Sequence, residues 1–178
     1  MSRRRGRLGL LSALAVALAA APPAWGQGGS GSLVADATVV NATAVVTPLR
    51  NLVFGTVPRG VATTVAPTAA AAGQWQVSGS ANAFVLITLT LPSQLTNVQA
   101  APGVTMPITF GATSARWRRA NNNPAGATAF NPNAGTIGRL GPPANPTLYV
   151  WLGGTVTPSA TQLPGIYTGN AILTIVVF

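Results

Sequence analysis

The chain has 178 residues, no histidine, no cysteine and one acidic residue, Asp36, and its ten basic residues are all arginine. Without imidazole, thiol or a second carboxylate, it cannot form a Ser-His-Asp or Cys-His centre, a paired-carboxylate glycosidase site or a zinc site. We therefore expect a protein that is not an enzyme, with no catalytic residues, no metal site and no cofactor.

The first 26 residues resemble an export signal. A basic segment, Arg3–Arg7, precedes an apolar run, Leu8–Ala21, and Ala24-Trp25-Gly26 fits a cleavage site before Gln27. The apolar run is shorter than the ~20 residues that a membrane-spanning helix needs. We predict a signal-peptide helix over 1–26, with an uncleaved anchor as the alternative. After cleavage we expect no stable membrane span, and a location in the periplasm, on the cell surface or outside the cell.

Removal of the leader leaves six arginines against Asp36, a net charge of +5, over about 152 residues. A chain of that length forms one domain and buries roughly 68–70% of its unfolded surface. Since it has no disulfide, its stability depends on core packing. We predict a flexible spacer over 27–32, which is rich in glycine and serine, and one domain over 33–178.

The segment Leu33–Val46 is strand-like but changes phase at Val39-Val40. Such a change indicates a bulge, or two strands that meet there. Pro48 is expected to end this unit. A strand is then expected over Leu52–Val57, followed by a turn and a returning strand over Val61–Ala66.

The middle of the chain alternates apolar and polar residues with a period of two, as strands do. Strands are predicted over Trp75–Gly79, Ala83–Leu91, Val104–Phe110 and Ala115–Arg119. No periodicity extends across Ala120–Pro146, which is read as a long loop with one short strand at Thr136–Leu140.

The end of the chain has the strongest strand pattern. A strand over Thr147–Leu152 is expected to turn at Gly153-Gly154 and return over Thr155–Thr157. From Tyr167 to Phe178 the odd-numbered positions are all apolar, which predicts a strand with one buried face. Among these elements we expect Trp151, Tyr167 and Leu173 to be buried. Together they predict an all-β, antiparallel β-sandwich of seven to nine strands.

One segment, Arg116-Trp117-Arg118-Arg119, has the composition of a binding site. Arginine binds phosphate and carboxylate in a bidentate manner, and tryptophan can stack, so the segment suggests a patch for an acidic polymer. The simpler interpretation, which we favour, is a strand end whose arginines flank one packing tryptophan. Three arginines are too few for a nucleic-acid-binding surface, and no nucleic-acid partner is expected.

Three aromatic residues of the predicted strands, Trp75, Tyr149 and Trp151, suggest a sugar-binding site. Core packing is the more common role of strand aromatics, and it is the interpretation that we favour.

Two segments resemble a known family. L-V-F-G-T-V at Leu52–Val57 is similar to a signature near the start of the exported bacterial pilin-like domain-of-unknown-function family 4402. T-L-Y-V-W-L-G-G-T-V at Thr147–Val156, followed by G-I-Y-T-G at Gly165–Gly169, resembles the closing segment of that family. The family is similar to spore coat protein U and, more distantly, to chaperone–usher pilins. The resemblance implies an immunoglobulin-like β-sandwich and assembly by strand donation, and it implies no catalytic or binding residues.

The leading hypothesis is an exported, non-catalytic structural protein, a pilin-like or fimbrial cell-surface subunit that polymerises by β-strand donation. Its partners would be further copies, related subunits, a periplasmic chaperone and an usher. The donor would be the first half of the phase-shifted segment, with Leu33, Ala35, Ala37 and Val39 on its inserted face. Intramolecular pairing of this stretch as a bulged edge strand is the other possibility. The alternative function is a secreted binding module for anionic glycans or other acidic polymers.

Overall fold

The computed structural model describes residues 29–39, 44–100 and 103–178, with the side chains of 29, 30 and 36–39 outside that description. The predicted signal-peptide helix and its cleavage site also lie outside the described residues. Fourteen strands occupy the described ranges, which contain no helix. None of these residues, therefore, belongs to a helix that could cross a membrane.

The strands are β1 (Gly29–Val39), β2 (Ala44–Arg50), β3 (Leu52–Val57), β4 (Thr63–Val65), β5 (Gly73–Gly79), β6 (Phe84–Thr90), β7 (Gln94–Asn97), β8 (Thr105–Thr109), β9 (Ala115–Arg119), β10 (Thr128–Phe130), β11 (Thr136–Arg139), β12 (Thr147–Leu152), β13 (Gly154–Val156) and β14 (Ile166–Val177).

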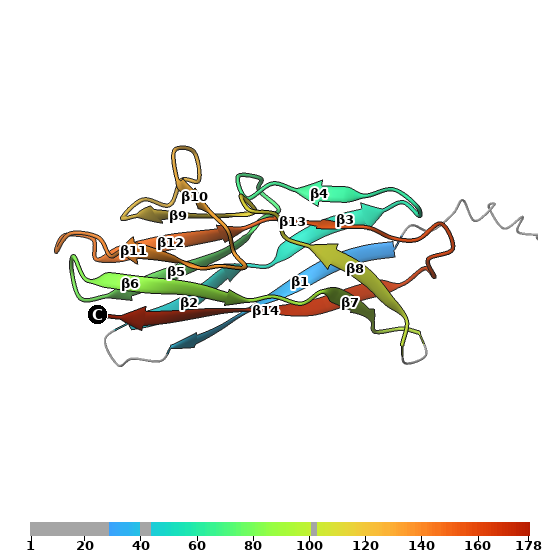
Figure 1. The fold of residues 1–178 in the computed structure, drawn as a ribbon, viewed down its shortest axis with the longest axis horizontal. Helices are drawn as coiled ribbons and strands as arrows, with labels where there is room; N and C mark the ends of the chain where they lie inside the picture. The colour runs from blue at the N-terminus through green and yellow to red at the C-terminus, as the bar shows by residue number, and fades with distance from the viewer. Residues whose placement is uncertain (1–28, 40–43, 101–102) are drawn as a thin grey trace, which may run out of the picture.

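These strands form two sheets that pack as a β-sandwich, and the expected all-β sandwich is confirmed (Figure 1). The larger sheet has nine strands, with the path β11-β6-β14-β7-β8-β13-β4 and with β1 and β3 added beside β14. The smaller sheet has the order β10-β9-β12-β5-β2. The expected count of seven to nine strands is too low. The sequence analysis did not predict β7 and β10, which are too short to show a clear alternation.

The last strand, β14, organises the larger sheet. It pairs antiparallel with β7 near its start and with β6 over Ile172–Val177, and it pairs in parallel with β1 along its other edge. Its odd-numbered side chains Tyr167, Ala171, Leu173 and Ile175 are buried, as the alternation predicts. The parallel β1–β14 pair is the exception in an otherwise antiparallel sandwich.

The phase change at Val39-Val40 separates two strands that lie in different sheets. β1 belongs to the larger sheet and β2 to the smaller one, where β2 pairs with β5. The expectation that Pro48 ends this unit is wrong, since β2 continues to Arg50. Proline is tolerated there because β2 is an edge strand, and the register shifts between Pro48 and Arg50.

The predicted spacer over 27–32 needs a correction, because β1 begins at Gly29. Ser30 and Gly31 pair with β14 on one side and with β3 on the other. A Cβ atom on Gly31 would lie 3.4 Å from the terminal methyl carbon of Met106. Gly31 therefore lies in ordinary contact with a buried side chain, and its paired backbone makes this part of the chain a strand rather than a linker.

The segment after β12 also differs from the expectation. Gly153-Gly154 was predicted to turn the chain into a hairpin, but β13 does not pair with β12. Instead the chain crosses from the smaller sheet to the larger one, where β13 pairs with β8 and β4. β4 is accordingly not a partner of β3, which pairs with β1.

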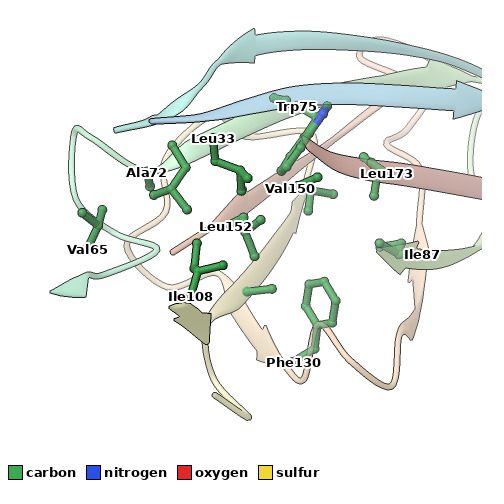
Figure 2. Packing of buried hydrophobic residues seen from close by; sticks show 14 of the residues in the cluster. Leu33, Val65, Ala72, Trp75, Ile87, Ile108, Phe130, Val150, Leu152 and Leu173 are labelled. Atoms are coloured by element: carbon green, nitrogen blue, oxygen red, sulfur yellow. The ribbon is translucent and has the colours of Figure 1, made fainter. Parts of the chain in front are cut away.

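The core lies between the two sheets and draws side chains from both (Figure 2). Trp75, Val150 and Leu152 come from the smaller sheet, and Leu33, Ile87 and Leu173 come from the larger one; all are buried. Trp151 is also fully buried, as predicted, but it is not a member of this cluster. It lies on the outer face of the smaller sheet, next to the arginine-rich strand.

Candidate functional site

Strand β9 carries the arginine-rich segment and lies between β10 and β12 in the smaller sheet. Because successive side chains of a strand point to opposite faces, the segment does not form one patch. Trp117 packs against the core as a partly buried side chain. Arg116 and Arg118 lie opposite Trp151 and Tyr149 of β12, on the outer face. The strand therefore separates the aromatic ring from the two guanidinium groups that were predicted to act with it.

The guanidinium groups of Arg116 and Arg118 fasten the loop that follows β9. Arg116 Nη1 donates a 2.9 Å hydrogen bond to the carbonyl oxygen of Ala127. Arg118 Nη1 donates to the carbonyl oxygens of Asn123, at 3.1 Å, and Ala125. Such charge-assisted bonds are stronger than neutral ones, so these arginines order a loop that has no strand pairing of its own.

Arg119 is directed to a different place, the end of the sandwich that carries the β5–β6 turn. Its Nε donates a 2.8 Å hydrogen bond to the carbonyl oxygen of Leu140, and its Nη2 donates to Asn82 Oδ1. Arg139 reaches the same turn, with a 2.9 Å bond from Nε to the carbonyl oxygen of Asn82. Its guanidinium carbon also lies 5.2 Å from the centre of the Phe84 ring, within the range of a cation–π interaction.

Asn82 is thus the residue on which two arginines converge, and it has a φ of 62°. Asparagine tolerates this left-handed conformation better than most residues. The sequence analysis placed no functional role there. The sequence offers one indication of this turn: an asparagine in the short Ser-Ala-Asn-Ala segment between two predicted strands.

The arginines of β9 and β11 keep their positive charge available to other ligands because their hydrogen-bond acceptors are neutral. The hydrogen bonds that Arg116, Arg118, Arg119 and Arg139 make within the described structure all end on neutral carbonyl or amide oxygens. The guanidinium charges are therefore not neutralised by these contacts. A guanidinium also has five N–H donors, more than these contacts use. The arrangement can therefore attract anions. The same arginine side chains also donate hydrogen bonds to loop carbonyl oxygens.

A second small buried region lies on the outer face of the smaller sheet. The Trp151 ring stacks on Tyr149, with 6.1 Å between ring centres. Gln74, opposite Trp151 on β5, is buried and donates from Nε2 to Asn122 Oδ1 of the loop after β9. Among the described atoms, Trp151 Nε1 and Arg116 Nε are buried N–H donors without a hydrogen-bond partner. The sequence analysis missed this region because Gln74 and Asn122 are far apart in the chain.

The three aromatics suggested as a sugar site do not line one surface. Trp75 faces the core between the sheets, whereas Trp151 is fully buried on the opposite face of the same sheet. Tyr149 is only partly exposed. The structure therefore gives these residues packing roles, in agreement with the interpretation favoured from the sequence.

The residues predicted to form a donor strand lie inside their own domain. Leu33 is 1% exposed, and Ala35 is also buried, both within the shared core. The backbones of Ala37 and Val39 pair with Leu173 and Ile175 of β14, and their side chains lie outside the description. β1 pairs within its own chain, as one of the two hypotheses held, but between β3 and β14 rather than as an edge strand.

Large apolar side chains gather on the outer face of the larger sheet, at the end where Asn82 lies. We define the Phe84 cluster as Phe84, Leu86, Ile137 and Phe178, all of them exposed. Ile137 lies opposite Leu86 on β11 and β6, and the Phe84 and Phe178 rings stack with 6.4 Å between their centres. An apolar cluster rimmed by an arginine is typical of a surface that contacts another molecule.

The fold and these sites define a class, a β-sandwich whose first described strand, β1, lies between two others. No protein-family model and no curated protein matches the sequence.

Proposed function

We propose that the protein is an exported, non-enzymatic structural subunit, pilin-like in character, that self-associates by exchanging strand β1. The observation that carries this proposal is the position of β1 between β14 and β3. β1 begins the described part of the chain, and only residues 40–43 separate it from β2. Further copies or related subunits are the partners that this proposal names, with a periplasmic chaperone and an usher as assembly factors.

The energetics of exchange follow from the contacts of β1. Withdrawal of the strand would expose the pairing edge of β14 and the site that Leu33 fills, at a large cost in free energy. An identical strand from another copy would restore the same hydrogen bonds and the same buried surface. Exchange between copies is therefore nearly neutral in contact energy, which is why domain swapping is a low-cost route to assemblies.

The composition supports a structural role. The chain has one acidic residue and no histidine or cysteine, so general acid–base and nucleophilic centres lack their usual groups. The proposed export places the mature protein in the periplasm, on the cell surface or outside the cell. Mass spectrometry of the exported protein tests this part, and a chain that begins at Gln27 is the expected result. Retention of residues 1–26 would contradict it.

A pair of engineered cysteines tests the exchange, since the chain has no cysteine of its own. Val34 and Asn170 are partners in the parallel β1–β14 pair, and both side chains are exposed. Neighbouring strands lie about 4.8 Å apart, within reach of a disulfide. V34C/N170C is unfolded with its thiols reduced by added dithiothreitol, refolded at high concentration and then oxidised. Under these conditions we expect intermolecular disulfides, whereas dilute refolding should give intramolecular ones.

The matched control is T88C/T174C, which joins β6 to β14 without involving β1. Its disulfide should stay intramolecular under the same conditions, because both strands remain in one subunit. Only intramolecular disulfides in V34C/N170C at every concentration would overturn the proposal.

A second candidate function rests on the arginines around Asn82 and the loop after β9. Their guanidinium groups contact only neutral acceptors in the described structure, which favours a secreted binding module for anionic glycans or other acidic polymers. In that case the monomer should bind an acidic polysaccharide resin and elute with salt. Arg118→Gln should elute at a lower salt concentration than the parent. Arg59→Gln changes an exposed arginine of the β3–β4 turn, so its shift measures the effect of losing one unit of net charge, and the shift for Arg118→Gln should exceed it.

A further inference from the structure

The connection from β1 to β2 lies at one particular end of the sandwich. Val39, the last residue of β1, pairs with Ile175, and Ala44, the first residue of β2, pairs with Gly79. Gly79 precedes the β5–β6 turn, and Ile175 lies near the end of β14, so both ends of the connection are at the Asn82 end (Figure 1). The opposite end carries the β3–β4 turn, where Gly60 N–H donates to the carbonyl oxygen of Ser159.

The covalent length of this connection limits how two exchanging copies can lie. Five peptide units join the Cα atoms of Val39 and Ala44, which spans at most about 18 Å when fully extended. If β1 enters another copy in the register seen here, its Val39 lies beside the Ile175 of that copy. The Ala44 of the donor must then lie within that distance, which brings the Asn82 ends of the two copies together.

We propose, on the basis of the strand exchange proposed above, that exchange in this register produces a closed reciprocal dimer rather than a filament. Both copies face each other with the end at which β1 leads into β2 and at which Val39 pairs with Ile175. Each strand can then enter the other copy, and the contact is closed about a two-fold axis. A filament would require β1 to emerge at one end of a subunit and to be received at the other.

The surface at the facing ends fits a second copy of this chain. The Phe84 cluster lies on the outer face of the last residues of β14 and the first residues of β6, and Phe178 and Ile137 are 66% and 58% exposed. In the reciprocal dimer each copy covers these side chains with the equivalent region of the other. The dimer thus buries an apolar surface that the single domain leaves in water.

The residue types in the connection agree with an extended path. The sequence of residues 40–43 is Val-Asn-Ala-Thr, with neither glycine nor proline. The β-branched residues among them favour strand conformations over a tight reversal.

The charges at this end oppose the contact and make it dependent on salt. Arg119 and Arg139 both reach Asn82, so a two-fold axis nearby places four guanidinium groups close together. Their repulsion is screened as the ionic strength rises. The dimer should therefore tighten with added salt, whereas binding of an acidic polymer to the same arginines would weaken.

Single cysteines in the mature chain test the geometry. Ala81 is exposed in the β5–β6 turn and Thr161 is exposed at the opposite end. With a flexible bismaleimide, Ala81→Cys is expected to give covalent dimers at the concentration where V34C/N170C becomes intermolecular. Thr161→Cys should stay monomeric, and a mixture of the two variants should give no product that joins position 81 of one copy to position 161 of another.

The outcomes separate the two proposals. Products that join position 81 to position 161, or disulfide-linked ladders longer than a dimer in V34C/N170C, would overturn the reciprocal dimer while strand exchange remained valid. Purely intramolecular disulfides in V34C/N170C would instead overturn strand exchange.

The apolar surface is tested by Phe84→Ser, which should weaken the dimer at least tenfold in analytical ultracentrifugation. Val61→Ser, a change of an exposed apolar residue at the other end, should leave the dimer unchanged. Equal dimerisation of both serine variants would overturn the role of the Phe84 cluster.

Discussion

Gly153 lies against the carbonyl oxygen of Val65, so that a Cβ atom built on Gly153 would be only 2.3 Å from that oxygen. This is where the chain leaves β12 in the smaller sheet and enters β13 in the larger one. The contact is with backbone, which cannot rotate away as a side chain can. Glycine is therefore required where the two sheets are joined by a single residue.

Gly153→Ala should lower the free energy of unfolding by about 1–3 kcal/mol, the usual cost of forcing extra atoms into a packed site. The measurement is the midpoint of chemical denaturation. Gly111→Ala is the matched control, since a Cβ atom there would have Ser114 Oγ, at 3.6 Å, as its nearest neighbour. An equal midpoint for the two variants would contradict the close approach at Gly153.

Trp151→Ala should cost about 3–5 kcal/mol, because a fully buried aromatic ring is removed from under the loop after β9. The loss should appear in the denaturation midpoint. Val45→Ala, which truncates an exposed side chain of β2, should leave the midpoint almost unchanged. If Trp151→Ala unfolds at the midpoint of the parent, the outer-face region does not contribute to stability.

Asn82 allows the cost of a backbone conformation to be separated from the loss of a hydrogen bond. Asn82→Gly keeps the positive φ accessible but removes the acceptor of Arg119, so it should cost about 1–3 kcal/mol. Asn82→Ala should cost roughly 1 kcal/mol more, because alanine disfavours the left-handed region. Thermal unfolding of both variants checks the order. Equal loss in both would mean that φ at this turn relaxes.

Arg118 is expected to order the loop after β9 rather than to stabilise the core. Arg118→Gln removes the bonds to the carbonyl oxygens of Asn123 and Ala125, so amide exchange should accelerate locally over residues 121–127. Hydrogen–deuterium exchange with mass spectrometry measures this. Arg59→Gln should change exchange near the β3–β4 turn only. Unchanged protection over 121–127 in Arg118→Gln would show that the loop is held by other contacts.

The long strands could be predicted from the sequence because their burial follows a simple alternation. The predicted strand Ala115–Arg119 coincides with β9, and the buried odd positions of β14 are those that the sequence indicates. This information is local: each strand carries the pattern of its own two faces. It is sufficient for the fold class and for much of the core.

The choice of strand partners could not be predicted in the same way. Gly153-Gly154 has the composition of a hairpin turn, and only the distant backbone of Val65 shows that it is a crossing between sheets. The roles of the arginines are similarly non-local. Their acceptors are mostly backbone carbonyl oxygens of loops, as at Ala127 and Leu140. Every residue has a backbone carbonyl group, so the amino-acid sequence does not indicate which of them accept these bonds.

The parallel pairing of β1 with β14 also sets an order of events during synthesis. Ser30 and Ile166 are paired although 136 positions separate them, so β1 is synthesised long before its partner β14. Until β14 has emerged, β1 has only β3 as a partner, and its apolar residues are open to competing chains. Contacts of such long range slow folding and prolong the exposure of aggregation-prone segments. The proposed strand exchange would therefore compete with closure of the monomer in the interval after β14 is released, and a higher local concentration of other copies would favour exchange.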